Sequence, residues 1–356
     1  PILANIAFNG NKAMATDLEV GVIYELDKSV GKIALPAEQL KGKNLEELVV
    51  DEKERKATIG GLELQGQSLD EFPIIPEVKA KPQIAVSFDA LETGLSQTIK
   101  HAAVSDTRPE LNGLFFKNEN GKLRIVTTDS FRLNQVYVDA KIENGFEAIL
   151  PLNSAKKVLR LLKQIKPDIP IEIAIDKKTN NIQLKSGKVT VVSRTIDGNY
   201  PDYKKIIPEK AKIVTTFSKT DLAAVIKEAP VTSLNDIQIH YASDGKSLTI
   251  KAIQKTEGIS FSKTIPARTV KKEIKINPDE NIYLVMPLRD VEKGTVAVNR
   301  KFISDYLDNV DSYDIEFLDT GADGTPFLMR EAKAEYQSAF SDQTKISSDE
   351  AKDLVY

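Results

Sequence analysis

The chain has 356 residues, of which 41% are hydrophobic, so it is long enough for two or three domains with buried cores. It carries 49 Lys and Arg against 52 Asp and Glu, a net charge of −3, and it contains no cysteine. The lack of cysteine excludes disulfide scaffolds, thiol catalysis, iron–sulfur clusters and cysteine-based zinc sites. Proteins that bind nucleic acid over their whole surface are usually strongly basic, so any such contact must come from locally clustered Lys and Arg.

No apolar run approaches the roughly 20 residues that a membrane-spanning helix needs, and no charged-then-apolar leader opens the chain. We therefore expect a soluble, cytoplasmic protein with no membrane partner. His101 and His240 lie far apart in the sequence, so we expect no multi-histidine metal site and no His-based catalytic triad.

Three stretches read as a strand, a Gly-bearing turn and further strands. They are Asn5–Leu26, Gly113–Val138 and Ile237–Ile265. The first two also share a Thr-Asp pair after the turn, Thr16-Asp17 and Thr128-Asp129. Repetition of this kind predicts similar structural units along one chain.

A predicted helix and then strand-like sequence follow each of these hairpins. The helices are Pro36–Leu40, Pro151–Ile165 and Asn299–Val310; the strand-like stretches are Lys56–Leu64, Ile171–Ser193 and Tyr313–Met329. Two further helices, Phe88–Ala103 and Ser218–Glu228, precede the later hairpins and begin at serine caps. The repeat is therefore helix, hairpin, helix and strands, with a period of about 110–125 residues.

This repeat predicts three similar domains. Linkers are expected at Pro73–Pro82 and Pro208–Lys212, and an insert around Val270–Asn281 stretches the third copy. We assign residues 1–80, 81–208 and 209–331 to the domains and 332–356 to a polar C-terminal tail. The first copy lacks its leading helix, so we expect its N-terminal part to be missing.

The helix predicted at Pro151–Ile165 is amphipathic. Lys156, Arg160 and Lys163 share one stripe, with Lys157 beside it. The opposite face carries Val158, Leu159, Leu161, Leu162 and Ile165. The basic stripe is either an ordinary solvated face or a sequence-independent phosphate contact. Basic residues recur at related places in the repeat, at Lys41 and Lys43, at Lys100, His101 and Arg108, and at Arg300 and Lys301.

Catalytic motifs are missing from the sequence: there is no phosphate loop, nucleophile elbow or zincin motif. Asp17, Asp129 and Asp197 are expected to accept hydrogen bonds from turn amides, and both histidines are expected to be structural. A hydrolase that uses Asp129 or Asp197 is a remote alternative because neither has a paired base. We expect no catalytic residue, no metal and no cofactor.

Three stretches resemble the middle domain of the bacterial DNA polymerase III beta subunit family, the sliding clamps. They are RPELNGLFF at Arg108–Phe116, VTTDSFRL at Val126–Leu133 and TIDGNYPDYKKIIP at Thr195–Pro208. The opening PILAN, ATDLEV at Ala15–Val20 and EFP at Glu71–Pro73 resemble the first domain, and Asn299–Val310 resembles the second helix of the third. The resemblance covers about residues 1–330.

The resemblance implies an α+β clamp fold of three similar domains, each with two helices packed on antiparallel sheets. It implies a head-to-tail homodimer that forms a ring around double-stranded DNA, with the helices lining the hole, and no catalysed reaction. The implied channel residues are Lys100, Arg108, Lys156, Lys157, Arg160, Lys163, Lys219, Arg300 and Lys301. The alternative is a clamp-fold interaction scaffold that does not encircle DNA.

The resemblance also implies a pocket for short peptide motifs of the replicative DNA polymerase catalytic subunit, the clamp loader and other clamp-binding proteins. Its residues are Thr128, Ser130, Phe131, Arg132, Leu133, Pro201, Lys205 and Ile206. Core packing is the alternative for Leu133 and Ile206. Ser130-Phe131 replaces the family's usual Gly-His, and Lys205 stands where Arg is common.

The family ends in Met-Pro-x-Arg-Leu, which forms part of that pocket. The similar VMPLR at Val285–Arg289 precedes the third-domain helix, so no pocket role is assigned to it. The implied dimer contact joins Leu62 and Leu64 to Ala229, Pro230 and Val231, with packing inside one domain as the alternative.

Overall fold

The computed structural model describes residues 2–104, 107–143, 145–254, 256, 258–288, 294–321 and 325–332. Its contacts group the chain into two compact units. Unit 1 holds residues 1–95, 105–125 and 138–200, and unit 2 holds 96–104, 126–137 and 201–356.

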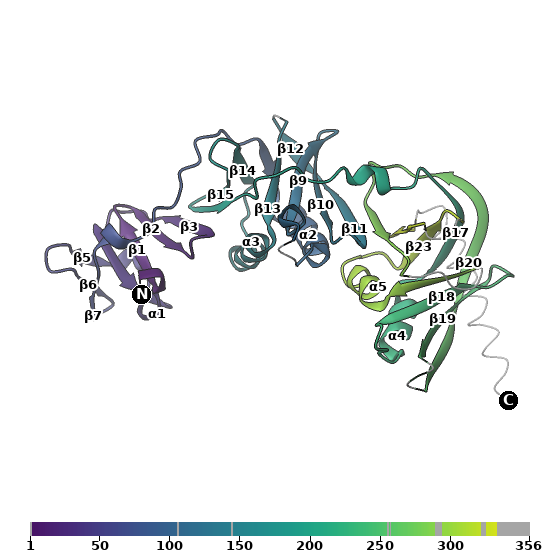
Figure 1. The fold of residues 1–356 in the computed structure, drawn as a ribbon. Helices are drawn as coiled ribbons and strands as arrows, with labels where there is room; N and C mark the ends of the chain where they lie inside the picture. Colours follow the sequence, from purple (N-terminus) through teal and green to yellow (C-terminus); the bar gives the residue numbers. More distant parts are fainter. Residues whose placement is uncertain are drawn as a thin grey trace. The chain divides into compact units, whose positions relative to one another are not determined.

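Unit 1 is built on antiparallel sheets and is coloured purple to teal in Figure 1. Its nine-stranded sheet runs in the order β12-β8-β14-β15-β16-β3-β2-β1-β4. These strands are β1 (Asn5–Asn9), β2 (Lys12–Thr16), β3 (Val20–Glu25), β4 (Lys32–Pro36), β8 (Ile84–Val86), β12 (Ala140–Ile142), β14 (Ile171–Asp176), β15 (Asn181–Ser186) and β16 (Val189–Arg194). The sheet joins the first hairpin to the strands at Ile171–Arg194, because β16 pairs with β3.

A three-stranded sheet, strands of the twelve-stranded sheet and three of the described helices complete unit 1. The three-stranded sheet is β5 (Val49–Asp51), β6 (Lys56–Ile59) and β7 (Leu62–Gln65). The second hairpin gives β9 (Gly113–Glu119) and β10 (Lys122–Thr128), and β13 (Glu147–Pro151) pairs with β9. The helices are α1 (Ala37–Leu40), most of α2 (Phe88–Thr98) and α3 (Leu152–Ile165).

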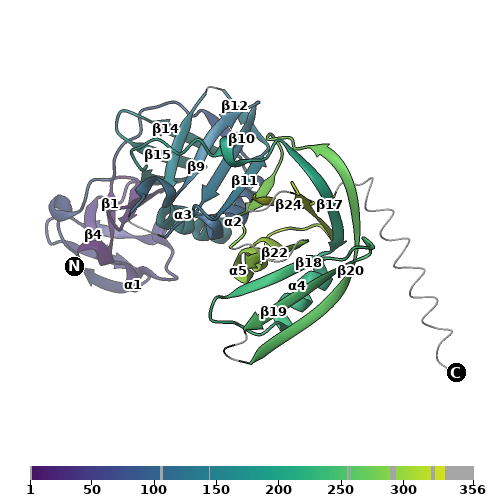
Figure 2. The same cartoon turned by 45° about the vertical axis from the view of Figure 1, so that its right-hand side comes forward.

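Unit 2 has one continuous run of strands, in the order β11-β21-β24-β23-β17-β20-β19-β18-β22. They are β11 (Arg132–Val138), β17 (Lys210–Ser218), β18 (Asp236–Tyr241), β19 (Ser247–Gln254), β20 (Ile259–Lys275), β21 (Ile282–Val285), β22 (Thr295–Asn299), β23 (Asp314–Asp319) and β24 (Phe327–Glu331). The helices α4 (Lys219–Glu228) and α5 (Arg300–Leu307) lie side by side against these strands (Figures 1 and 2). Leu222 and Val225 of α4 and Ile303 and Leu307 of α5 share one buried core with the strands.

The α+β prediction with antiparallel sheets is confirmed, and each predicted hairpin forms strands. The serine caps are also confirmed: the Ser218 side chain accepts from the N–H of Asp221, and Ser87 Oγ accepts from Ala90. Since these caps satisfy amides that a first helical turn leaves free, they fix where α4 and α2 begin.

The start of the expected insert, Val270–Lys275, forms part of β20 and pairs with β17. Two local predictions were wrong. Lys210–Lys212, expected in a linker, belongs to β17, where exposed lysines flank buried Ala211, the alternation of a half-buried strand. Ile165, expected on the packed face of α3, is 37% exposed because it lies in the last turn. The expected tail lies outside the described residues apart from Ala332.

Candidate functional site

The Thr-Asp pair of the first hairpin closes a tight turn between β2 and β3. Thr16 Oγ1 donates to the carbonyl oxygen of Val20 at 3.0 Å. Asp17 Oδ1 accepts from the backbone N–H groups of Glu19 and Val20 at 3.1 and 2.9 Å. Leu18 takes a left-handed conformation with φ of +78°. The turn is therefore held by side-chain caps on its own backbone.

The second hairpin repeats this turn between β10 and β11. Thr128 Oγ1 donates to the carbonyl oxygen of Arg132 at 2.7 Å, and Ser130 has φ of +75°. Asp129 Oδ1 accepts from the N–H groups of Phe131 and Arg132, both at 3.0 Å. The prediction that Asp17 and Asp129 accept hydrogen bonds from turn amides is confirmed. This structural role accounts for both carboxylates without a hydrolytic function.

Arg132 lies at the centre of a buried ionic cluster in unit 2. Its guanidinium bonds to Asp129 Oδ2 at 2.9 Å, to Asp305 Oδ2 at 2.7 Å and to the carbonyl oxygen of Lys100 at 2.9 Å. It also lies 4.4 Å from the ring centre of Phe302 on α5. Since the Arg132 side chain is 6% exposed, its charge holds residues 96–104, the turn and α5 together.

The carboxylate of Asp305 is held in its charged form. Burial alone would raise its pKa, but hydrogen bonds from Lys301 and Arg132 outweigh burial and lower the pKa below its ordinary value. Lys301 Nζ lies 2.8 Å from Asp305 Oδ1. The Arg132 pair thus stays ionic under ordinary conditions.

The predicted pocket residues divide into exposed and buried groups. Phe131 and Ile206 are 59% and 46% exposed, whereas Leu133 is fully buried and Thr128 is 6% exposed. Core packing, the alternative weighed for these apolar residues, therefore applies to Leu133 only. Pro201 precedes the 3-10 helix η6 (Tyr203–Ile206), on which exposed Lys205 pairs with Asp202 at 3.0 Å.

The stretch Val285–Leu288 lies against the Thr128–Leu133 turn, a place to which the sequence prediction had not assigned it. β21 pairs with β11 so that Val285 lies opposite Arg132, and Met286 donates its N–H to the carbonyl oxygen of Phe131 at 2.9 Å. Leu288 is 42% exposed. The VMPLR motif could have predicted this position. Because it precedes α5 in the sequence, the pairing of β21 with β11, which brings it to the turn, was not expected. Arg289 lies outside the described residues.

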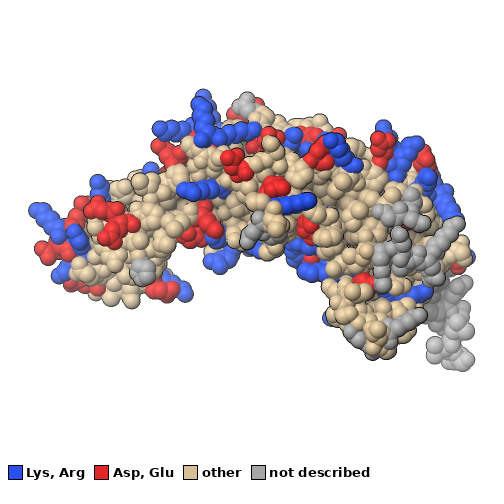
Figure 3. All heavy atoms as spheres, viewed as in Figure 1, with Lys and Arg blue, Asp and Glu red and all other residues tan. Residues whose placement is uncertain are grey.

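Two α3 cations of the predicted channel are exposed and, among the residues that the structure describes, unpaired. Lys156 and Arg160 make no ion pair or side-chain hydrogen bond within the described residues. Lys157 contacts Asp17 Oδ2 and Glu19 Oε2 at 2.6 and 2.8 Å, and Lys163 contacts a glutamate of α2 at 2.9 Å. In Figure 3, Lys and Arg side chains project at the place where Figure 1, in the same view, shows α3.

The Asp17–Lys157 contact is largely solvent-exposed. Burial would raise the pKa of Asp17, but hydrogen bonds from Lys157 and from the amides of Val20 and Glu19 lower it below the ordinary value. The Lys157 side chain is 40% exposed. Its ion pairs are therefore weak in energy compared with the buried pair of Arg132.

Four channel candidates of unit 2 have partners inside the protein. Lys100 pairs with Asp308 at 3.1 Å and Lys301 with Asp305. Arg300 donates to the carbonyl oxygen of Ile226, and Lys219 donates to that of Val310. Arg108 is exposed. Lys156 and Arg160 of α3 are therefore freer for a phosphate than these four residues.

The predicted dimer residues are mixed in exposure. Leu64 is buried in the first-hairpin core with Leu62 packed on it, and Ala229 is also buried, whereas Val231 is 68% exposed. β7 pairs with β6 alone among the described residues. Its other backbone edge is therefore open.

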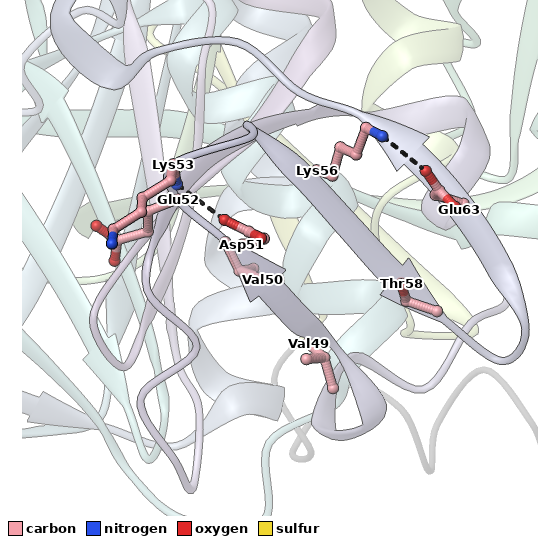
Figure 4. A pocket seen from close by; sticks show the side chains of 8 residues that line it. All are labelled: Val49, Val50, Asp51, Glu52, Lys53, Lys56, Thr58 and Glu63. Atoms are coloured by element: carbon pink, nitrogen blue, oxygen red, sulfur yellow. Dashed lines mark hydrogen bonds and ion pairs between the residues drawn. The ribbon is translucent and has the colours of Figure 1, made fainter.

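One face of the β5–β6–β7 sheet is hollowed to about 670 Å³ (Figure 4). Val49, Val50 and Thr58 lie on it between charged side chains. Lys56 pairs with Glu63 at 3.3 Å, and the backbone N–H of Lys53 donates to Asp51. Since the charges of this hollow are partly satisfied within the sheet, it offers no clear set of groups for a ligand.

Both histidines lie in structural surroundings. His101 is fully buried, its Nδ1 lies 3.1 Å from the Asn134 side-chain nitrogen and its ring packs on Tyr283. Burial and the charge of Arg132 lower the pKa of His101 to about 3. His240 Nδ1 lies 2.8 Å from Thr295 Oγ1. No group of three or more metal-ligating residues occurs in the part of the chain that the structure describes. None of its described helices is long and apolar enough to cross a membrane.

The family model and the relatives that match this chain are those of DNA polymerase III beta subunits and beta sliding clamps. Residues 85–202 match the family model of the DNA polymerase III beta subunit, central domain. The beta sliding clamps of Staphylococcus epidermidis and Staphylococcus aureus are 26% and 25% identical, and each alignment covers 89% of this chain and 85% of the relative.

Solved structures give the same fold. The DNA polymerase sliding clamp of Pseudomonas aeruginosa aligns with a TM-score of 0.76 at 21% identity, covering 94% of this chain and 89% of that one. The sliding clamp of Bacillus subtilis aligns with a TM-score of 0.73 at 22% identity, covering 92% and 90%. The central-domain match, the relatives that align along most of the chain and the shared fold thus all make this chain similar to DNA polymerase III beta subunits, the beta sliding clamps.

Proposed function

We propose that two copies of this chain form a ring around double-stranded DNA and tether the replicative polymerase to it. The chain is a sliding clamp and a non-catalytic processivity factor. The ring proposal rests on a strand junction, a pairing between edge strands of neighbouring repeats. This pairing occurs twice within the chain, and one edge strand near each end of the repeat series has no such partner among the described strands.

The two junctions have the same form. The third strand of the first hairpin, β3, pairs with β16, and the third strand of the second hairpin, β11, pairs with β21. The third hairpin ends in the first half of β20, Ile259–Pro266, which pairs only with β19 among the described strands. β7 closes the first copy and has the open edge described above. Pairing of β7 with the first half of β20 of a second copy would repeat the junction and close a ring.

DNA contact is assigned to α3. Lys156 and Arg160 are exposed, unpaired among the described residues and separated by one helical turn, so both reach the same side of α3. Long cationic side chains bind phosphates without reading bases, which suits a ring that slides. The remaining channel residues stay candidates.

Partner peptides are assigned to the surface beside the Thr128–Leu133 turn. Phe131, Ile206 and Leu288 are three large apolar side chains of unit 2 that remain more than 40% exposed. Peptides of the polymerase, the clamp loader and other clamp-binding proteins would place Leu or Phe anchors against them. Met286, whose backbone N–H donates to the carbonyl oxygen of Phe131, would form a side of this surface that the sequence prediction did not include.

The test of the ring is topological. The protein should be a dimer by light scattering, should stay on nicked circular DNA after loading, and should leave when that DNA is linearised. Ser262→Pro should weaken the dimer, because the N–H of Ser262 lies on the edge of β20 away from β19 and proline cannot donate to a ladder. A stable monomer that is retained equally on linear DNA would contradict the proposal.

A scaffold without encirclement is the second candidate. The internal pairing of the α4 and α5 cations and the net charge of −3 favour it. It predicts peptide binding with normal affinity but no retention on circular DNA, so the same experiment separates the two.

A further inference from the structure

A cavity of about 250 Å³ lies in unit 1 beside the first Thr-Asp turn. Its floor crosses three neighbouring strands, because Ala15 of β2 lies opposite Val22 of β3, and Val22 lies opposite Val191 of β16. Val20 lies two residues from Val22 on the same face of β3. The floor is therefore a continuous apolar row.

One wall of the cavity is a stripe of α3. Lys157, Arg160, Leu161 and Gln164 line it, at the spacing that places residues on one side of a helix. The charge of Lys157 is already matched by Asp17 and Glu19. Arg160 and Gln164 have no side-chain partner among the described residues. The cavity thus has a compensated Asp17–Lys157 pair at the turn and an uncompensated cation, Arg160, at its other end.

This polarity selects the chemistry of a ligand. The volume is below that of a typical drug-sized site and suits one or two large apolar side chains. A carboxylate is attracted more strongly at Arg160 than at the paired Asp17, because the planar guanidinium of Arg160 can hold both carboxylate oxygens. The matching group is an apolar side chain over the valines followed by an acidic one.

We infer that this cavity is a second docking site, which takes a Leu or Phe side chain followed by an acidic residue from a partner protein. The choice of a peptide rests on the proposed function, because the equivalent turn at Thr128–Arg132 borders the proposed partner-peptide surface. The same turn then builds two docking sites of different charge in one chain.

The test uses the full chain with labelled Val and Leu methyl groups and the probe acetyl-Leu-Phe-Asp-amide. Saturable shifts are expected at Val22, Val191 and Leu161, with a dissociation constant of about 1 mM for so small a probe. Arg160→Gln should weaken this binding about tenfold. Val22→Phe, which fills the cavity, should abolish it.

Lys156→Gln is the matched control, since it removes a cation of α3 that does not line the cavity. It should leave the peptide shifts unchanged while reducing DNA retention. Absent shifts at Val22, or equal weakening by Lys156→Gln and Arg160→Gln, would overturn the inference. If Phe131→Ala removed every shift, the peptide would bind only at the other surface, and this inference would be wrong while the proposed function stood.

Discussion

The two Thr-Asp turns have the same backbone and opposite electrostatics. Each faces a helix that follows a strand, and Lys157 of α3 and Asp305 of α5 hold the same position counted from Pro151 and Asn299 at the N-caps. At the first turn the helix supplies a cation to exposed carboxylates. At the second turn Arg132 supplies the cation and the helix supplies a buried carboxylate.

This contrast shows how one repeat serves two purposes. A buried ion pair is costly to break, so the second turn is fixed to α5. An exposed pair adds little stability, so the first turn leaves α3 with free cations and an open cavity. Strand pairing and turn caps are shared, whereas the charge on the facing helix differs: a buried carboxylate of α5 fixes the second turn, and an exposed cation of α3 contacts the first.

The strongest test of this contrast removes the acid of the buried pair. Asp305→Ala leaves the guanidinium of Arg132 buried with one carboxylate partner, and we expect a decrease of about 3 kcal/mol in the free energy of unfolding. Lys157→Met removes the cation of the exposed pair and should cost about 0–1 kcal/mol. Urea unfolding followed by circular dichroism measures both, and equal decreases would show that the two clusters do not differ in burial as described.

Of the two turn regions, only the second contains a histidine, which predicts a pH dependence there. His101 has an unfolded pKa near 6.5 and a folded pKa of about 3, so below pH 6.5 the unfolded state binds the proton and the folded state does not. His101 therefore leaves the free energy of unfolding unchanged above pH 6.5. Below that pH it lowers the free energy of unfolding, by about 2 kcal/mol at pH 5.

His101→Gln should remove that part of the pH dependence of urea unfolding. Thr127→Val, a change at another fully buried polar residue of the same unit, should retain it. A His101→Gln protein with the wild-type pH profile would mean that the histidine is charged, or accessible to protons, in the folded state.

Local patterns predicted much of this structure because their causes are local. The Gly-bearing turns, the serine caps and the alternation in the hairpins depend on residues close in the sequence. The prediction that Asp17 and Asp129 cap turns is of the same kind. The amphipathic pattern of Pro151–Ile165 likewise predicted the buried and exposed faces of α3, apart from Ile165 in its last turn.

The remaining features depend on pairing between distant segments. Nothing near Arg132 in the sequence indicates that Asp305 will meet it. The Lys301–Asp305 pair, in contrast, has the i, i+4 spacing that a helix brings together. Met286 reaches Phe131 only because β21 pairs with β11. Sequence order placed it before α5 and therefore outside the expected pocket.

The contrast between the turns also predicts which helix binds DNA. Lys156→Gln with Arg160→Gln removes two free cations, and we expect retention on circular DNA to fall about tenfold. The slope of binding against salt concentration should decrease by about one unit for each phosphate that is no longer bound. Lys301→Gln removes a cation that is paired with Asp305 and should change retention by less than about twofold. Equal effects would indicate that α5 contributes to the channel as much as α3.

The smallest effect tests whether the two turns are truly equivalent. Leu18 and Ser130 both have φ near the left-handed region, where a Cβ atom costs about 1–2 kcal/mol and glycine costs only its additional chain entropy. Leu18→Gly and Ser130→Gly should each raise the free energy of unfolding by about 0.5–1 kcal/mol. Ala140→Gly, in a strand residue without positive φ, should lower it by a similar amount. If only one of the two turns gained stability, the backbone conformations would differ, and the charge arrangement could no longer be the sole feature that separates the regions.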